Sequence, residues 1–173
     1  MPPKNRKPIE QVIAGTPYPP AAFEFLQEGL AGAVHRVHGP RSEQEALIDQ
    51  WMAKTNTAPN YLAELYHSHS LPREIQQMVE KAGGPERFNR HVSGQQLSWA
   101  LRDLAIGKWG LMARTVLRRW GVTRTEDFGR MVFALVENDY LQAQPSDSVE
   151  DFRDVFDFEE AFSPLACQEH PAE

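Results

Sequence analysis

Apolar residues recur every three or four positions along much of this chain, which is the spacing of amphipathic helices. The clearest stripe begins at Phe23 and continues until Gly39-Pro40 ends the pattern. Gly29 and Gly32 lie inside this stripe and lower helix propensity by about 1 kcal/mol each. Such a loss is typical of positions where another backbone packs closely. The pattern therefore predicts a long helix from Pro20 with one face on a core.

Two capping sequences mark where further helices begin. Ser42 with Glu45, and Ser93 with Gln96, have the spacing of a capping box, in which a serine oxygen and an acidic or amide side chain satisfy the first backbone N–H groups. Proline and glycine delimit the remaining segments with helical spacing. Besides the helix from Pro20, the expected helices span about 9–14, 42–54, 60–67, 72–82, 93–107, 111–120 and 125–138.

The last two of these helices have specific expected caps and core positions. The spacing after residue 110 places Met112, Val116 and Trp120 in the core, and Gly121 suits a left-handed helix end. Thr125 is expected to cap the next helix. We expect one core to contain Leu101, Phe128, Val132 and Leu135.

The helical spacing stops after Leu141. Short segments at 142–143 and 152–158, separated by a turn at 145–148, predict a β-hairpin. The predicted fold class is mainly α, a compact multi-helix domain. Three helices followed by a hairpin have the order of a winged helix, so the C-terminal half is predicted to be winged-helix-like.

The domain organisation follows from the positions of the helical segments and of the proline and glycine residues that separate them. Residues 1–8 are basic and rich in proline, which favours a flexible arm. Residues 9–162 are expected to form a single helical domain, with 42–90 as a helical insert between two better-patterned blocks. Residues 163–173 are expected to form a flexible tail.

The net charge of −6 is concentrated at one end of the chain. Residues 145–173 contain nine acidic groups and one basic group, whereas residues 42–144 contain twelve of each. Such an acidic segment repels nucleic-acid phosphates, so it disfavours nucleic acid as a partner. Three roles for the acidic segment are open: it solubilises the chain, it binds a basic partner, or it folds back on the chain's own arginines.

Composition also bears on the compartment. No apolar run approaches the roughly 18 residues that a membrane span needs, and the start of the sequence has no apolar signal-peptide core. The single cysteine, Cys167, has no partner for an internal disulfide or a thiolate cluster. We therefore expect a cytoplasmic protein without membrane attachment.

Three segments resemble a small bacterial family found largely in planctomycete and verrucomicrobial lineages. They are 91–97 (HVSGQQL), 120–129 (WGVTRTEDFG) and 157–162 (DFEEAF). A weaker similarity lies at 18–23, and the 42–90 segment is longer than expected for the family. The resemblance covers about residues 91–162 and implies a helical fold, but it implies no reaction because the family has no established activity.

Histidine pairs are the most metal-like feature of the sequence. His67 and His69 flank one serine, but residues two positions apart on a helix point in diverging directions. His35 and His38 share a helix face without an obvious carboxylate ligand. Surface or capping roles are therefore favoured over a metal site, and a histidine-based metal-dependent enzyme is retained only as a second alternative.

Other catalytic signals are weak. His91 lies close to Ser93, but a serine that caps a helix has its oxygen occupied by backbone N–H groups, and no G-x-S-x-G sequence is present. Neither a Walker nor a Rossmann phosphate loop occurs. We therefore expect no cofactor and lean against an enzyme.

Basic and aromatic residues gather between positions 108 and 124. Arg114 and Arg118 are one helical turn apart, so they present a cationic ridge together with Arg119. The alternative interpretation is that these arginines only solvate the outer face or pair with the acidic segment. We expect the ridge and the acidic segment to interact, within one chain or between copies. The candidate interaction surface comprises Lys108, Trp109, Arg114, Arg118, Arg119 and Arg124.

These observations favour a non-catalytic module that binds an unknown protein partner or a second copy of itself. The first alternative is a winged-helix-like nucleic-acid-binding or regulatory protein. The acidic residues of the expected hairpin oppose that alternative, because a DNA-reading wing is normally basic.

Overall fold

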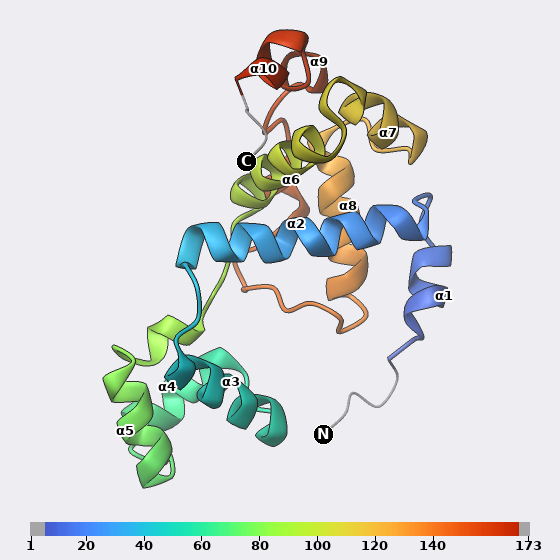
Figure 1. Ribbon diagram of the computed structural model, residues 1–173. Coiled ribbons are helices and arrows are strands. Elements are labelled where there is room, and N and C mark those ends of the chain that lie inside the picture. Colours follow the sequence, from blue (N-terminus) through green and yellow to red (C-terminus); the bar gives the residue numbers. More distant parts are fainter. Residues whose placement is uncertain (1–5, 170–173) are drawn as a thin grey trace. The chain divides into compact units, whose positions relative to one another are not determined.

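The computed structural model describes residues 6–169, and all regular secondary structure in this part of the chain is helical (Figure 1). The α-helices are α1 (Ile9–Ala14), α2 (Pro20–His38), α3 (Glu43–Thr55), α4 (Pro59–His67), α5 (Arg73–Lys81), α6 (Gly94–Trp109), α7 (Ala113–Arg119), α8 (Thr125–Val136), α9 (Phe158–Ala161) and α10 (Pro164–Gln168). The 3₁₀ helices are η1 (Pro85–Phe88), η2 (Gly110–Met112) and η3 (Val149–Phe152). The predicted mainly α fold class is confirmed.

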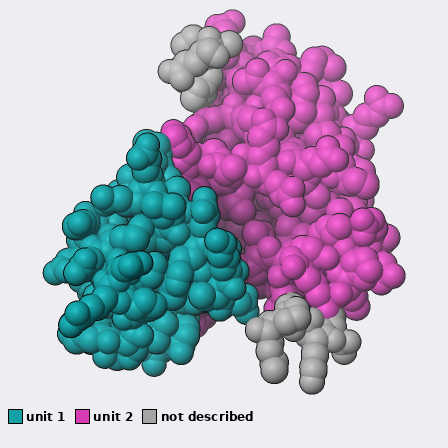
Figure 2. Space-filling model, turned by 60° about the horizontal axis from the view of Figure 1, so that its bottom comes forward, with its two compact units in different colours: residues 1, 38–91 teal, residues 2–37, 92–173 magenta. Residues whose placement is uncertain are grey.

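The chain forms two compact units (Figure 2). Unit 1 is His38–His91, and unit 2 contains the described residues on either side, 6–37 and 92–169. Each unit has its own cluster of buried apolar side chains. The sequence predicted one domain with an insert at 42–90, and that segment lies entirely within unit 1.

Unit 1 is a small helical bundle. Its buried core contains Ile48 from α3, Leu62 from α4, Val79 from α5 and Phe88 from η1. The predicted capping box at the start of α3 is confirmed, because Ser42 Oγ accepts a hydrogen bond from the Glu45 backbone N–H at 3.2 Å.

The two ends of unit 1 are joined by hydrogen bonds. His38 Nε2 lies 2.7 Å from the carbonyl oxygen of His91. The Arg90 guanidinium donates to the carbonyl oxygen of Gly39, and Arg41 donates to the carbonyl oxygen of Arg87 at 3.2 Å. The chain therefore enters and leaves unit 1 at neighbouring points, as expected for a segment inserted into a longer fold.

In unit 2, helix α2 packs closely against α6. A Cβ atom at Gly29 would overlap the Leu101 side chain, so only glycine allows this approach. Gly32 has no atom within 4 Å of a Cβ position, so the predicted close packing is present at Gly29 and absent at Gly32. Phe128 and Leu135 are buried with Leu101 in the same core, as expected, and Val132 packs against it partly buried.

A second close approach involves two helices and the C-terminal segment. Phe152, in η3, lies against Gly94 of α6 and Gly129 of α8. A Cβ atom at Gly129 would lie 2.9 Å from the Phe152 side chain, and one at Gly94 would lie 3.0 Å from the same ring. Glycine at both positions therefore forms the notch that holds Phe152, which is only 4% exposed.

The predicted β-hairpin is wrong, and with it the winged-helix arrangement. Residues 142–158 contain η3, loops and the first residue of α9, and no strand occurs within residues 6–169. Phe152 and Phe158 of this segment insert into the core of unit 2, and Phe156 packs against it, so the three rings do not alternate across a sheet. Short polar caps replace ladder hydrogen bonds: Asp157 Oδ1 accepts from the backbone N–H groups of Glu159 at 2.8 Å and Glu160 at 3.1 Å.

Two further expectations are corrected around α7 and α8. Met112 is exposed, and Val116 and Trp120 are only half-buried, because the buried residues of α7 are Ala113 and Leu117. Thr125 does not cap α8 but is its first residue.

Thr125 is fully buried, and its Oγ1 accepts a hydrogen bond from the Val155 backbone N–H at 3.2 Å. A side chain expected to cap its own helix therefore binds the C-terminal segment. Gly121 has the left-handed conformation expected of it, with φ of +80°.

The described parts of the predicted arm and tail make contacts with the rest of unit 2. The Arg6 guanidinium lies 3.5 Å from the centroid of the Tyr140 ring, and Tyr140 Oη donates to the carbonyl oxygen of Lys7 at 2.8 Å. Residues 164–168 of the predicted tail form α10. The other parts of the arm and tail, 1–5 and 170–173, lie outside the described residues.

The two helical glycines Gly129 and Gly32 give a matched test of the notch. Gly129→Ala should lower the free energy of unfolding by about 1–3 kcal/mol, because the new methyl group displaces Phe152 from a packed site. Gly32→Ala should raise it by about 0.5–1 kcal/mol, because the site has room and alanine favours helix. Urea denaturation measures both, and a stabilising Gly129→Ala would contradict the notch.

Candidate interaction surface

A break between α6 and α7 exposes two large apolar side chains. Gly110 ends α6 with φ of +52° and ψ of −126°, a backbone conformation that favours glycine. The 3₁₀ turn η2 follows before α7 begins at Ala113, so the helical phase changes between the two helices. As a result Leu111 is 65% exposed and Met112 is 57% exposed.

Helix α10 lies beside η2 and adds a third apolar residue. Cys167 Sγ of α10 lies 3.8 Å from the carbonyl oxygen of Gly110, the first residue of η2, so the two elements are neighbours. Leu165, on α10, is 69% exposed. Leu111, Met112 and Leu165 are the three most exposed large apolar residues in the described part of the chain, and we refer to them as the apolar corner.

Arginines from the predicted surface lie next to this corner. Arg114, in the first turn of α7, is 3.9 Å from Glu159 of α9. Arg118 and Arg119, in the last turn of α7, are exposed and form no ion pair with another residue between 6 and 169. The C-terminal end of α7 therefore keeps two cationic side chains that this part of the chain does not neutralise.

The remaining predicted residues have other surroundings. Lys108 Nζ is 2.9 Å from Glu28 Oε2 of α2. Trp109 is half-buried, with its ring centroid 5.3 Å from that of Phe25 and 5.4 Å from that of Trp120. Trp109 therefore packs against the core of unit 2 and supports α6.

Arg124 is exposed at the start of α8, after Gly121 has ended the α7 segment. Of the six predicted residues, only Arg114, Arg118 and Arg119 share α7 beside the apolar corner. The helical spacing after residue 110 did not indicate the apolar corner, although Gly110 in the sequence marks the point where a new helical phase begins.

The predicted pairing of the ridge with the acidic segment occurs at one place among the described residues, Arg114 with Glu159. Glu159 and Glu160 are exposed on α9, and the Glu159 side chain is 81% exposed. The acidic residues of α9 therefore adjoin the first turn of α7, which begins directly after Leu111 and Met112 of η2.

The buried polar groups of unit 2 have structural partners. Asp127, 4% exposed in α8, accepts a hydrogen bond from Tyr18 Oη at 2.6 Å. The same carboxylate accepts from the backbone N–H groups of Thr123 at 2.9 Å and Arg124 at 3.2 Å. Asp127 therefore joins the N-terminal segment to the start of α8.

The environment of Tyr18 shifts the pKa of its hydroxyl group. Burial, followed by the hydrogen bond to Asp127 and the charge of that carboxylate, raises the pKa of Tyr18 to about 12. A tyrosinate beside Asp127 would place two negative charges together in a site with little water, so the neutral phenol is favoured.

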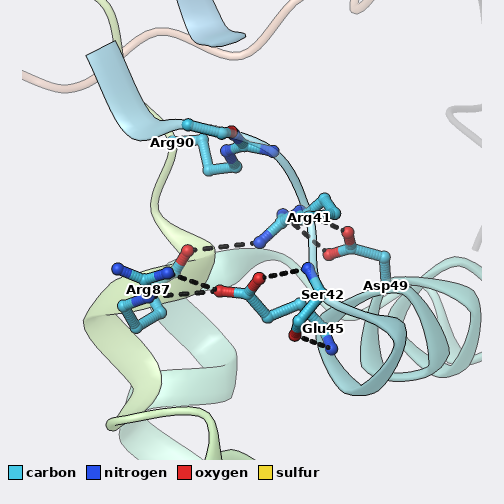
Figure 3. A network of polar contacts seen from close by, with 7 residues as sticks. Arg41, Ser42, Glu45, Asp49, Arg87 and Arg90 are labelled. Carbon is cyan, nitrogen blue, oxygen red and sulfur yellow. Dashed lines mark hydrogen bonds and ion pairs between the residues drawn. The ribbon is translucent and has the colours of Figure 1, made fainter. Parts of the chain in front are cut away.

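Unit 1 contains a denser network of charged groups around the start of α3 (Figure 3). Glu45 is 3% exposed, accepts from the Ser42 backbone N–H at 2.8 Å and pairs with Arg87 at 3.1 Å. These contacts lower the pKa of Glu45 below its ordinary value, with the Ser42 backbone hydrogen bond as the largest cause. Glu45 therefore links the first turn of α3 to η1.

A second pair belongs to the same network. Arg41 Nε is 2.7 Å from Asp49 Oδ2. Burial raises the pKa of Asp49 despite the opposing charge of Arg41, and burial lowers the pKa of Arg41. Because each of these side chains binds a group of unit 1, the network holds that unit together.

The histidines of the sequence analysis do not converge. His67 Nε2 is 3.8 Å from Glu86 Oε1, and His69 Nδ1 is 3.4 Å from Gln76 Nε2. His69 also has a left-handed backbone, with φ of +53°. Between residues 6 and 169, no group of three or more His, Cys, Asp or Glu side chains is arranged to hold a metal ion.

Ser93 has the capping role expected from its sequence. Its Oγ accepts from the Gln96 backbone N–H at 3.1 Å, and Gln96 Oε1 accepts from the Ser93 backbone N–H at 3.0 Å. The hydroxyl oxygen is therefore occupied by the first turn of α6.

No helix within the described residues has the length and apolar character needed to cross a membrane. Comparisons with protein-family models, curated proteins and solved structures found no match for this chain.

The Tyr18–Asp127 hydrogen bond predicts a dependence of stability on alkaline pH. Because the folded-state pKa lies above that of an unfolded tyrosine, near 10, the contribution of Tyr18 is complete below about pH 10 and is lost as pH rises to about 12. Between those values the parent should lose about 1–2 kcal/mol of unfolding free energy relative to Tyr18→Phe. Urea titrations at each pH measure this difference, and parallel profiles would contradict it.

The Glu45 network predicts an acid-sensitive contribution to unit 1. At neutral pH, Glu45→Gln should lower the free energy of opening of the α3 amides, measured by hydrogen exchange, by about 1–3 kcal/mol. The reason is that Arg87 and the Ser42 N–H lose a charged acceptor. Since the pKa of Glu45 is lowered on folding, the difference should disappear as pH falls through that lowered pKa. Leu47→Ala, at an exposed position of α3, is the control. An effect of Glu45→Gln that persists at acid pH would contradict the role of the charge.

Proposed function

We propose that this chain is a non-catalytic, cytoplasmic protein–protein interaction module whose docking surface is the apolar corner with the adjoining arginines of α7. The observation that carries the proposal is the exposure of Leu111, Met112 and Leu165 on two neighbouring elements, η2 and α10. Scattered exposed apolar residues are normal on protein surfaces, whereas a group of them bordered by charged residues is typical of interaction sites.

The chemistry of the neighbouring side chains supports docking of a protein rather than catalysis. Arginine and methionine are both enriched in protein interfaces, and here they occupy adjacent elements. The buried carboxylates Asp127 and Glu45 bind backbone N–H groups and neighbouring side chains, so they serve the fold. Membership of the planctomycete and verrucomicrobial family remains a prediction and adds no partner.

Site-specific photo-crosslinking tests the docking surface directly. p-Benzoylphenylalanine at position 112 or 165 should form a discrete adduct with a partner protein or a second copy in cell extract. The same group at position 47 is the matched control, because Leu47 is 54% exposed but lies in unit 1. Equal adducts at all three positions, or none at 112 and 165, would overturn the proposal.

A further inference from the structure

We infer that residues 6–15 form a strap that opens about Thr16 as a separate unit and uncovers, on unit 2, a site for a short amphipathic helix. In the closed chain the occupant of this site is α1, which lies against α8. The inference does not depend on the apolar corner, because the strap and its site are built from other elements.

Helix α1 docks through one apolar face. Ile9, Val12 and Ile13 have the i, i+3, i+4 spacing that places side chains on one side of a helix. Val12 is 5% exposed, and Ile9 and Ile13 pack against the core of unit 2. The other residues of α1 are exposed. A short helix with one apolar face on a larger body is a common mode by which one protein segment binds another.

The helical conformation of α1 depends on this docking. The helix has six residues, whereas an isolated helix shorter than about 12–15 residues is marginal in water. Pro8 precedes it and provides no side-chain hydrogen bond to its first turn. Residues 9–14 therefore lose their helical hydrogen bonds when they leave unit 2, and the exchange of their amides reports the opening of the strap.

The polar attachment of the strap is made by Tyr140, shortly after the end of α8. The Tyr140 ring lies under the Arg6 guanidinium, and its hydroxyl donates to the carbonyl oxygen of Lys7 at 2.8 Å. One hydrogen bond to a neutral acceptor and a few apolar side chains are a small attachment. Such segments open locally at a lower free energy than the core of the same protein.

The chain directly after the strap is held firmly. Tyr18 is 4% exposed, and its hydroxyl donates to Asp127 Oδ1 at 2.6 Å. Thr16 lies between the strap and this anchor, and its Oγ1 donates to the carbonyl oxygen of Ile13 at 2.7 Å, a contact within the N-terminal segment. Pro17 disfavours a helical conformation at Thr16, so α1 is not continuous with the anchored segment. The strap therefore opens at Thr16 while Tyr18 stays in place.

The strap competes with any partner helix for the same site. Because the linker to the Tyr18 anchor is short, the effective concentration of the strap is about millimolar. A free helix with apolar residues at the spacing of α1 therefore binds only when the strap is open or weakened. The strap acts as an autoinhibitory contact, and it selects partner helices whose apolar face binds more tightly than its own.

Hydrogen exchange in the full-length chain measures the opening. The Val12 and Gly15 amides, which are hydrogen-bonded within the strap, should be protected at least about 10-fold less than the Leu101 amide in the core helix α6. Tyr140→Phe should increase the exchange of the strap amides by about 2–10-fold and leave α6 unchanged, because it removes one hydrogen bond. Tyr61→Phe, at an exposed position of unit 1, is the matched control.

A fluorescent peptide of residues 6–17 tests the uncovered site. The full-length variant Val12→Asp should have an open strap, because a charge replaces a buried apolar side chain. In fluorescence anisotropy the peptide should bind this variant at least about 10-fold more tightly than the parent, in which the tethered strap occupies the site. The same peptide carrying Val12→Asp is the control ligand and should bind neither chain.

Three results would contradict the inference. Strap amides that exchange at the same rate as the α6 amides would show that α1 opens only with the whole of unit 2. Strap amides unaffected by Tyr140→Phe would show that Tyr140 does not hold the strap. Peptide binding to Val12→Asp that is absent, or no tighter than to the parent, would show that the opened face takes up no helix. If Val12→Asp loses the protection of α6, Tyr140→Phe replaces it and should bind the peptide about 2–10-fold more tightly than the parent.

Discussion

The insertion of Phe152 between Gly94 and Gly129 is the constraint on which the C-terminal half of unit 2 depends. Only a residue without a Cβ leaves room for the ring at these two positions, so α6 and α8 together form its site. With Phe152 held there, the chain continues directly into α9, whose Phe158 enters the same core. Two aromatic anchors therefore hold an acidic segment against the core of unit 2.

The position of that segment determines the properties of the candidate surface. Glu159 of α9 lies beside Arg114, and α10, which carries Leu165, lies beside η2, which carries Leu111 and Met112. A segment that remained detached would leave the arginines of α7 as a plain basic ridge, attractive to polyanions. Anchoring turns the ridge into one side of a mixed surface with charge of both signs.

The buried charged groups serve a different purpose. Asp127 in unit 2 and Glu45 in unit 1 each occupy the first turn of a helix, where backbone N–H groups need acceptors and the helix dipole favours a negative charge. Each also reaches a partner distant in sequence, Tyr18 and Arg87 respectively. The same carboxylate therefore satisfies a helix end and links two segments, which explains its burial without a catalytic role.

The sequence by itself determined the helices and most of their ends, because apolar spacing, capping serines and glycine or proline breaks act over a few residues. It indicated close packing at both Gly29 and Gly32, of which only Gly29 packs closely, and it placed Arg114, Arg118 and Arg119 on one helix. It did not determine what the segment after Leu141 would do. Short aromatic segments fit a strand or a core anchor equally well, and the notch at Gly94 and Gly129 decides between them only when distant helices pack. The break at Gly110 shifts the helical phase, but only the packing of α7 on the core of unit 2 decides that Ala113 and Leu117 are buried in the new phase and Met112 is exposed.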